Sequence, residues 1–515
     1  MKGFLPLISV IALLHGLACG SDAPNYFERS PTTPRRLDAN RVRRELGSRV
    51  SKATTIFGPE DSRYEIATSR YSTFAPPNVQ VVVVPGKESD VSTIVKFCNR
   101  NSIEFLTVNR GHGWTKTLGT FKGIQIDLEN LQNVDIQRSG RSAWFGGGTY
   151  AGPVAKYLWD RGYVTTTGSC DCVGLMGPGL GGGHGRLEGL YGLISDNVVQ
   201  FNVVLANGAS IRVSKSSHSD LFWALRGAGH GFGIVTSFEM NIFPRGPETW
   251  HYHNYYWRGD KLEAVFDALN KLHGNGTTPV DMAANFGGFS MNASITDKEP
   301  IIMWTFAYRG SAKAAERYLA PFNAIEAVSE TFGDVPYPSV AAAQLQDEDS
   351  VNCRHNVIRV TSAVGLQVYN LTAERQIFEA YKKRVPLHPQ LAAGASVFHE
   401  GYATAGMQAK NPMDSAYPFR DDNHLMLFST VVPPDNATAR KAALEWADEV
   451  RDQWRAGQPD RSLNVYLNYA TGFETLDQIY GHEDWRLKRL RQLKKKYDPF
   501  NRFHFYNPVN GRNKG

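Results

Sequence analysis

The sequence predicts an α+β protein built from two folded units. Three observations support this prediction. Short β-branched runs alternate with helical patterns from residue 76 to residue 246. The strand pattern changes from Thr249 and becomes richer in aromatic residues, and 42% of the 515 residues are hydrophobic. A chain of this length and composition can form two or three domains, each with a buried core.

We expect five segments along the chain. Residues 1–20 form a predicted signal peptide, and residues 21–75 form a lead-in that packs on the first unit. Residues 76–246 form the first unit, residues 247–460 a second unit, and residues 461–515 a segment that returns to the first unit. The second unit is expected to contain an antiparallel sheet covered by helices.

The N-terminus has the order of a secretory signal peptide. Lys2 precedes an apolar run from Phe4 to Leu17, and small residues follow as Ala18-Cys19-Gly20. The run is too short to span a membrane comfortably, and no later segment is apolar for long enough, so we expect no membrane partner. Four Asn-x-Ser/Thr glycosylation motifs agree with a secreted protein or one of the secretory lumen: Asn275, Asn292, Asn370 and Asn436.

The first unit is predicted from short strands and the helices between them. Val79–Val84 reads as a buried strand ended by Pro85-Gly86, and Ser89 or Asp90 is expected to cap the helix that follows. Asn207-Gly208 is a strong hairpin signal. Further strands are expected at 103–108, 124–128, 143–145, 198–205 and 211–213, with a helix at 150–161.

The second unit is predicted from alternating aromatic and polar residues. Trp250–Trp257 has this pattern, which is typical of a half-buried strand. Further strands are expected at 284–291, 301–308, 396–399 and 424–432, and helices at 311–322, 374–383 and 438–453.

Charge and cysteine content exclude several classes of protein. The net charge of +6 forms no long basic block, and the cluster Lys488–Lys496 reads as the solvated face of a helix, so no nucleic-acid partner is expected. Without the signal peptide the cysteines are Cys98, Cys170, Cys172 and Cys353, which can pair in three ways. The Cys-x-Cys spacing lacks the second pair that a structural zinc site needs, so no metal is expected.

Two glycine-rich loops each carry a nucleophilic side chain. His112 stands in Val108–Trp114, and Cys170 stands in Gly168–Gly174. Glycines let the backbone approach a flat or phosphorylated ligand closely. A nucleophile in each loop predicts a covalently tethered redox cofactor.

A third glycine cluster contains a formal G-x-G-x-x-G motif at Gly177, Gly179 and Gly182. A Rossmann fold needs a strand before this motif and a helix starting on it, and neither pattern is present. No Gly-Lys-Ser/Thr follows, so a P-loop is also not indicated. The free backbone N–H groups here and in Arg226–Gly233 still suit pyrophosphate binding, while tight turns are the alternative.

The ordered motifs resemble the vanillyl-alcohol oxidase and p-cresol methylhydroxylase (PCMH) superfamily of flavoproteins, in its berberine-bridge-enzyme-like branch. The resemblance covers nearly the whole mature chain. It is carried by the motifs at 76–85, 110–112, 145–149, 170–174, 180–185, 191–198, 220–227, 466–469 and 496–503. It implies a PCMH-type FAD-binding domain of two subdomains, a substrate domain and a berberine-bridge-like C-terminal segment.

The resemblance implies covalent FAD. His112 matches the histidine that bonds the flavin 8α-methyl carbon, and Cys170 matches the cysteine that bonds ring carbon 6 in bicovalent members. Cys172 competes with Cys170 for the flavin or for a disulfide. Further cofactor-binding residues are expected at Arg110, Gly111, Gly113, Gly174, Gly177, Gly181, Gly182, Gly183, Gly185, Asn197, Gly233, Ile234, Val235 and Asn468.

Hydride transfer to flavin also needs a base for the substrate proton. The resemblance makes Tyr469 the first candidate and Tyr466 the second, with a pKa lowered by nearby positive charge or hydrogen bonds. His399, Glu400 and Tyr402 lie beside the strand predicted at 396–399 and are expected to line the substrate pocket.

These features together predict a secreted FAD-linked oxidoreductase. It would oxidise an alcohol or close a ring in a small organic substrate, pass the electrons to dioxygen, and serve microbial, especially fungal, secondary metabolism, as the resemblance implies. One alternative is a carbohydrate oxidase of the same superfamily. The other is a flavin-fold binding protein without turnover, against which His112 and the Tyr466–Tyr469 motif argue.

Overall fold

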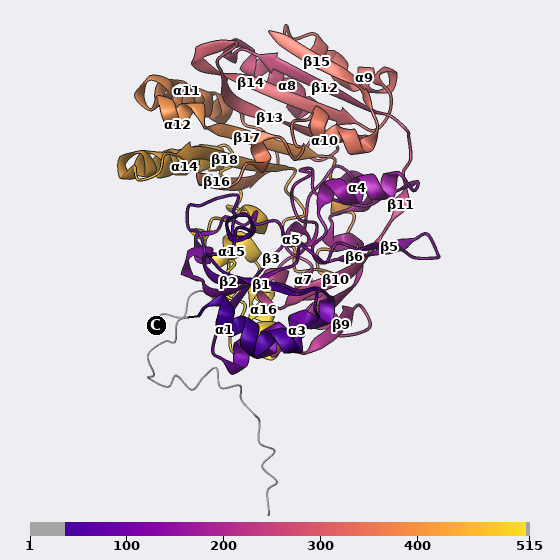
Figure 1. The fold of residues 1–515 in the computed structure, drawn as a ribbon. Helices are drawn as coiled ribbons and strands as arrows, with labels where there is room; N and C mark the ends of the chain where they lie inside the picture. The colour runs from indigo at the N-terminus through magenta and orange to yellow at the C-terminus, as the bar shows by residue number, and fades with distance from the viewer. Residues whose placement is uncertain (1–36, 511–515) are drawn as a thin grey trace, which may run out of the picture.

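The structure is a computed structural model that describes residues 37–510. The predicted signal peptide, and the part of the lead-in before residue 37, lie outside the described residues. Figure 1 shows two stacked parts. The lower part holds the N-terminal and C-terminal segments, and the upper part holds a broad sheet formed by the middle of the chain. The predicted α+β class is confirmed.

The first subdomain of the lower part is a four-stranded sheet in the order β1-β2-β4-β3. Strands β2, β4 and β3 are parallel, and β1 is antiparallel to β2. Val42 and Leu46 of the lead-in helix α1 lie in the same hydrophobic core as α3 and this sheet. The bounds are α1 Ala39–Leu46, β1 Thr55–Phe57, α2 Tyr64–Ala67, β2 Asn78–Val84, α3 Glu88–Arg100, β3 Glu104–Val108 and β4 Lys122–Asp127.

Helix α3 begins one residue before the predicted caps. Its N-cap is Lys87, so Ser89 and Asp90 lie inside the helix and the predicted cap is wrong. The Asp90 carboxylate accepts hydrogen bonds from the Lys87 and Ser51 backbone N–H groups, and also from the hydroxyls of Ser51 and Thr54. Asp90, which the sequence predicted as a cap, therefore binds the lead-in to helix α3.

The second subdomain is a five-stranded antiparallel sheet in the order β5-β6-β10-β8-β9. The Asn207-Gly208 turn joins β8 to β9, as predicted, and Gly208 has φ +81°. The bounds are β5 Val134–Ile136, β6 Ser142–Gly146, α4 Ala151–Trp159, β7 Tyr163–Val164, α5 Met176–Gly179, α6 Glu188–Tyr191, β8 Val198–Val204, β9 Ser210–Ser214, α7 Ser219–Leu225, β10 Ile234–Asn241 and β11 Phe243–Pro244.

The upper part is a seven-stranded antiparallel sheet in the order β15-β12-β14-β13-β17-β18-β16. Helices α8, α9, α11 and α14 pack on one face, with Phe266, Ile377 and Trp446 in that core. The strands are β12 Trp250–Trp257, β13 Met282–Asn292, β14 Thr296–Tyr308, β15 Ser329–Val335, β16 Ile358–Leu366, β17 Ser396–Tyr402 and β18 His424–Val432. The helices are α8 Leu262–His273, α9 Ala312–Asn323, α10 Val340–Ala343, α11 Leu371–Leu387, α12 Pro389–Ala393, α13 Ala405–Gln408 and α14 Ala437–Ala456.

The C-terminal segment returns to the lower part, where Figure 1 draws it in yellow. Helices α15 (Leu476–Tyr480) and α16 (Asp484–Tyr497) contribute Tyr480 and Leu490 to the core of the second subdomain. The predicted solvated basic face is wrong at Lys494, which is buried and donates hydrogen bonds to Asp498 and to the Gly231 and Phe503 carbonyls. This lysine therefore fixes the segment to the first unit.

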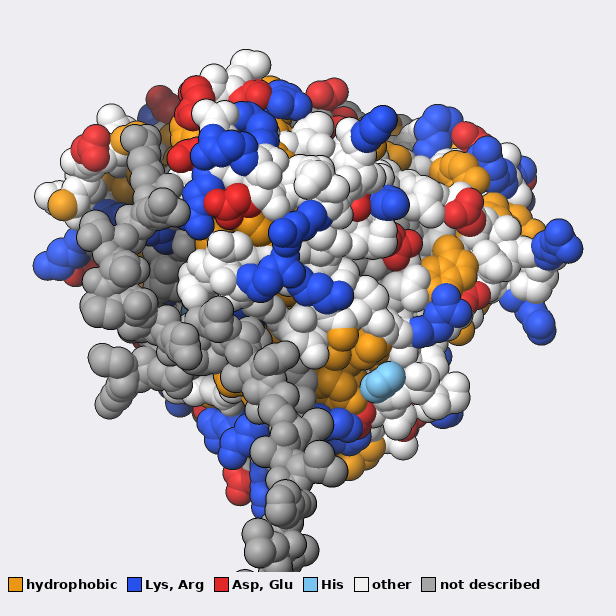
Figure 2. Space-filling model, turned by 60° about the horizontal axis from the view of Figure 1, so that its bottom comes forward, with side chains coloured by type: hydrophobic (Ala, Val, Ile, Leu, Met, Phe, Trp, Pro, Cys, Tyr) orange, Lys and Arg blue, Asp and Glu red, His pale blue; other side chains and the backbone are white. Residues whose placement is uncertain are grey.

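The surface carries both signs of charge. On the face in Figure 2, Lys and Arg side chains occur among acidic and uncharged ones. Among residues 37–510, no helix combines the length and the apolar character needed to cross a bilayer. Three of the predicted glycosylation asparagines, Asn275, Asn370 and Asn436, are exposed, and Asn292 is half-buried.

Candidate active site

A large cavity lies between the glycine loops of the lower part and the sheet of the upper part. Its volume is about 970 Å³, at the upper end of the range of roughly 300–1,000 Å³ that is usual for ligand pockets. The loops around His112 and Cys170 line one side, and strands β13, β14, β17 and β18 line the other. Phe503 and Tyr506 of the C-terminal segment line the end away from the sheet.

The His112 loop begins where strand β3 ends. Gly111 has φ +69°, and a Cβ there would lie 2.8 Å from the Ser69 carbonyl oxygen, so glycine is required. The His112 ring stacks on Tyr71 with 5.3 Å between ring centroids, and its Nδ1 lies 3.1 Å from the Arg110 carbonyl oxygen. Loss of hydration in the enclosed site, and then the neighbouring His355, lower the pKa of His112 to about 3. The imidazole is therefore neutral and keeps a lone pair.

The structure decides the cysteine pairing that the sequence left open. Cys172 and Cys353 form a disulfide, while Cys98 and Cys170 are free. Cys170 lines the cavity, and burial raises the pKa of its thiol to about 12. The competition between Cys170 and Cys172 thus ends with Cys172 in the disulfide and with the Cys170 thiol facing the cavity.

The predicted cofactor residues fall into two groups. One group lines the cavity: Arg110, Gly111, His112, Gly113, Cys170, Gly174, Gly177, Gly233, Ile234, Val235 and Asn468. The other group lies outside the cavity wall: Gly181, Gly182, Gly183, Gly185 and Asn197.

The glycines from 181 to 185 serve close packing rather than the cavity wall. A Cβ on Gly181 would lie 2.5 Å from Asn468 Oδ1, and one on Gly185 would lie 1.8 Å from the Thr167 carbonyl oxygen. Asn197 is buried, and its Nδ2 donates hydrogen bonds to the Tyr191 and Leu193 carbonyls. The structure therefore does not place these residues on the cavity wall, where they were expected to bind the cofactor. They hold the segments behind the wall together.

Tyr469 and Glu400 form the polar centre of the cavity. Tyr469 donates a hydrogen bond to Glu400 Oε2, and Tyr402 donates one to Glu400 Oε1. Loss of hydration, and then the negative charge of Glu400, raise the pKa of Tyr469 well above 10. The expectation of a lowered tyrosine pKa is wrong, because the group beside this hydroxyl is a carboxylate and not a cation. Burial also raises the pKa of Glu400, and the two tyrosine hydroxyls oppose that shift.

Tyr466, the second candidate base, lines the cavity beside Tyr469. Its hydroxyl accepts hydrogen bonds from the Gly183 N–H at 3.1 Å and from Asn468 Nδ2 at 2.6 Å. Asn468 Nδ2 also donates to the Pro178 carbonyl oxygen at 2.9 Å. These bonds connect the Tyr-x-Asn-Tyr motif to the glycine cluster and fix the position of Tyr469, whose ring centroid lies 5.1 Å from that of Tyr466.

Strand β17 separates the three predicted pocket residues. Glu400 and Tyr402 line the cavity as expected, but His399 does not. His399 is fully buried on the opposite face, where its Nε2 lies 2.8 Å from Glu374 Oε2. Successive side chains of a strand point to opposite faces, so three neighbouring positions cannot all face one pocket.

The structure adds residues that the sequence analysis missed. Arg70, Tyr71 and Arg359 line the cavity near His112, and the Arg359 guanidinium lies 4.2 Å from the Tyr71 ring centroid. His184 also lines the cavity, and it lies 2.9 Å from Glu188 Oε2 and 2.7 Å from Tyr417 Oη. No local pattern marks the first three, while His184 follows directly after the glycine cluster and offered a usable signal.

The cavity walls fit the FAD that the family resemblance implies. Gly168 and Gly177 both line the cavity, and a Cβ added to either meets no chain atom within 4 Å. Thr107 Oγ1 is a buried cavity-lining hydroxyl without a partner in the described part of the chain. The walls thus leave room for a flat ligand beside backbone, with an unsatisfied polar group facing that space. His112 and Cys170 are nucleophilic side chains on the same walls.

Comparison with known proteins identifies two blocks of the chain. The family model described as FAD binding domain matches residues 79–214, and the one described as berberine and berberine like matches residues 465–510. The FAD-linked oxidoreductase anuG of Penicillium roqueforti is 49% identical over 91% of this chain and 92% of its own length. The FAD-linked oxidoreductase iacH of Pestalotiopsis fici is 49% identical over 96% of both chains.

Solved structures share the fold at low identity. The chain matches wild-type Physcomitrella patens BBE-like 1 with a TM-score of 0.73 and 20% identity, covering 90% of this chain and 98% of that one. It matches the xylooligosaccharide oxidase of Myceliophthora thermophila with a TM-score of 0.75 and 20% identity, covering 88% and 97%. The alternative of a binding protein without turnover finds no support among these matches. The chain belongs to the FAD-linked oxidoreductases of the berberine-bridge-enzyme-like family and is an FAD-dependent enzyme.

Proposed function

We propose that this enzyme is a secreted oxidase that takes two electrons from an alcohol carbon of a small, largely apolar organic molecule and passes them to dioxygen. The observation that carries the proposal is the hydrogen-bonded pair of Tyr469 and Glu400, which shares one cavity with His112 and Cys170. This arrangement puts a proton acceptor and two cofactor-tethering nucleophiles on the walls of the same enclosed space. A pathway of fungal secondary metabolism would supply such a substrate.

His112 and Cys170 hold the cofactor in this proposal. The neutral His112 imidazole offers a lone pair for bonding the flavin, and the Cys170 thiol faces the same cavity. When bound, FAD would supply the two-electron acceptor for the substrate carbon and the group that dioxygen reoxidises. A covalent tether keeps the cofactor on an enzyme that works outside the cell.

Tyr469 and Glu400 move the proton. The raised pKa of Tyr469 keeps its hydroxyl protonated at neutral pH, so it cannot act as a base alone. We assign a relay in which Tyr469 Oη takes the substrate hydroxyl proton while its own proton passes to Glu400 Oε2. Tyr402, which donates to the other carboxylate oxygen, holds Glu400 in position for this transfer.

The sheet side of the cavity favours an apolar substrate over a carbohydrate. Sugar hydroxyls left without partners in a buried site cost binding energy. Hydrocarbon and thioether side chains are the largest group that the strands present there, and five hydroxyls lie among them, on Ser290, Thr305, Ser396, Tyr402 and Ser429. The apolar lining residues are Phe286, Phe289, Met291, Met303, Phe398, Leu427 and Val431.

Two features support secretion. A disulfide between Cys172 and Cys353 is typical of proteins that fold in an oxidising compartment. Three of the four glycosylation motifs have an exposed asparagine, and Asn292 is half-buried. Exposed asparagines are accessible to glycosylation, as expected for a glycoprotein of the secretory route.

Anaerobic reduction of the purified protein tests the function. The protein should be yellow, a panel of apolar primary alcohols should bleach it, and air should restore the colour with one hydrogen peroxide formed per turnover. Bleaching by oligosaccharides and not by alcohols would replace the apolar substrate with the carbohydrate alternative. A protein that carries no flavin would contradict the proposal as a whole.

A further inference from the structure

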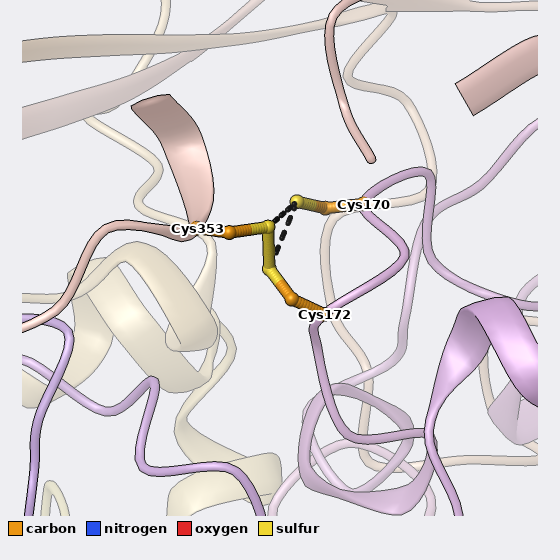
Figure 3. Close-up of side chains that lie close together, drawn as sticks. All are labelled: Cys170, Cys172 and Cys353. Carbon is orange, nitrogen blue, oxygen red and sulfur yellow. Dashed lines mark hydrogen bonds between the residues drawn. A yellow bond between two sulfur atoms is a disulfide. The ribbon is translucent and has the colours of Figure 1, made fainter. Parts of the chain in front are cut away.

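Three sulfur atoms from two distant segments meet at the edge of the cavity. Cys170 and Cys172 stand in the loop before α5, and Cys353 ends a short 3₁₀ turn, Val351–Cys353, between α10 and β16. The Cys170 Sγ lies 3.5 Å from the sulfur of Cys172 and 3.5 Å from that of Cys353 (Figure 3). The free thiol is therefore in contact with both halves of the disulfide.

The three sulfurs differ in what they face. Cys170 lines the cavity, whereas Cys172 is buried outside its wall, with its Sγ 3.5 Å from His112 Nε2. The disulfide ties the loop to the segment that carries Cys353, and a backbone hydrogen bond from Asp171 N–H to the Gln346 carbonyl oxygen joins the same two segments. A change of disulfide partner would therefore alter the cavity thiol without separating the segments.

We propose that Cys353 can bond either cysteine of the Cys-x-Cys pair, and that the partner it takes decides whether the cavity holds a free thiol. In the exchange, Cys170 loses its proton, and its thiolate attacks the sulfur of Cys353. The bond between Cys170 and Cys353 forms as the bond between Cys172 and Cys353 breaks. Cys172 leaves as a thiolate and takes up a proton. One thiol and one disulfide exist before and after, so no oxidant or reductant is consumed.

The third pairing, between Cys170 and Cys172, is disfavoured by chain geometry. It would close a ring across the single residue Asp171, and short stiff loops resist closure. The exchange to Cys353 has no such restriction, because the partner already lies 3.5 Å away on another segment. The burial that raises the pKa of Cys170 to about 12 keeps its thiol protonated at neutral pH, so exchange out of the isomer with Cys172 in the disulfide is slow.

The inference rests on the proposed function where it concerns the cofactor. A Cys170 sulfur that is bonded to Cys353 has no thiol left for a second bond to flavin. The isomer with Cys172 in the disulfide is therefore compatible with attachment through both His112 and Cys170. The isomer with Cys170 in the disulfide allows attachment through His112 alone.

Removal of Cys172 tests whether Cys353 can take Cys170 as its partner. Trypsin leaves Cys170 and Cys172 on one peptide, so free thiols are first blocked and the unreduced protein is then also cut before aspartate, where Asp171 separates the two cysteines. In C172S, and in C172A as a second form, we expect most Cys170 to be joined to Cys353. In the matched control C172S/C353S, we expect Cys170 to be free of any disulfide, and in C170S we expect Cys172 joined to Cys353.

The same digests report the cofactor. We expect flavin mass on the Cys170 peptide to fall at least tenfold in C172S relative to C172S/C353S, with flavin on the His112 peptide unchanged. The inference is overturned if Cys170 and Cys353 both remain unpaired in C172S and C172A. Absence of flavin from the His112 peptide in the wild-type enzyme would instead contradict the proposed cofactor attachment. The disulfide partners would still be determined independently from the same digests.

Discussion

The two faces of strand β17 use ionisable side chains for opposite purposes. On the cavity face, both carboxylate oxygens of Glu400 accept hydrogen bonds from Tyr402 and Tyr469. On the other face, His399 lies against Glu374, whose second oxygen accepts a hydrogen bond from Trp454 Nε1 at 3.2 Å. One carboxylate thus opens onto a space that can hold substrate, while the other is enclosed by protein.

The difference shows how one strand separates chemistry from stability. Glu374 and His399 are fully buried and satisfied by each other and by Trp454, so they hold helices α11 and α14 to the sheet. Glu400 accepts hydrogen bonds from two tyrosines, and one of them, Tyr469, lines the cavity with it and connects the carboxylate to the space that can hold substrate. Substitutions on the two faces should therefore separate catalytic from folding defects.

The largest effect is expected at the proton relay. E400Q and Y469F should each lower kcat/KM by about 10²–10⁴-fold, because each removes general-base catalysis. The double variant should be no worse than about tenfold below the single variants, since residues that act as a unit are not additive. Rapid-reaction measurement of flavin reduction checks this. An undiminished rate in E400Q would remove Glu400 from the relay.

On the opposite face we expect a loss of stability. H399L leaves the Glu374 carboxylate buried without its imidazole partner, which should lower the free energy of unfolding by about 3–5 kcal/mol. Denaturant unfolding measures the change, and kcat/KM per folded molecule should match the wild-type enzyme. E400Q is the control, with little effect on unfolding. A loss of catalysis in folded H399L would break the separation of the two faces.

The pH dependence should belong to the cavity face. Glu400 accepts the proton only when it is ionised, and burial raises its pKa above the usual value of 4.5. Below that raised pKa, kcat/KM should fall about tenfold per pH unit, and above it the rate should level off. The residual activity of E400Q should lack this acidic limb. A limb of the same midpoint in E400Q would assign the titration to another group.

The smallest effect is expected at neighbouring residues of strand β18. L427A shortens a cavity-lining side chain and should raise KM for an apolar alcohol by about tenfold, with stability almost unchanged. F428A removes a fully buried ring on the other face and should destabilise the enzyme by about 3–5 kcal/mol without changing KM. Steady-state kinetics and unfolding curves on both variants check the contrast. Equal effects on KM would contradict it.

Most secondary structure could be predicted from the sequence, because local patterns encode it. The strands Trp250–Trp257 and His424–Val432 begin and end as predicted, and the Asn207-Gly208 hairpin forms. The predicted N-cap of α3 was wrong because the helix begins earlier, with Lys87 as its N-cap. Asp90 still accepts a hydrogen bond from the Lys87 N–H, but its bonds to Ser51 and Thr54, which lie far away in sequence, could not be predicted from the local pattern.

The candidate site was predictable only where function lies in a local motif. His112, Cys170 and Tyr469 stand in short distinctive motifs, and all three line the cavity. Glu400 was named as a pocket residue, but its bond to Tyr469 joins segments that only the fold brings together. His399 was wrongly predicted to line the pocket, because the prediction did not consider that successive side chains of a strand point to opposite faces.

The sequence by itself determined the family, the α+β class, and the two loops that carry a histidine and a cysteine, since these depend on neighbouring residues. The tertiary structure decided which cysteine joins Cys353, which face of β17 meets the cavity, and which glycines pack the chain rather than line the wall. Each of these depends on contacts between segments far apart along the chain. The sulfurs of Cys170 and Cys353 belong to residues 183 positions apart, and they come into contact only when the seven-stranded sheet packs against the glycine loops.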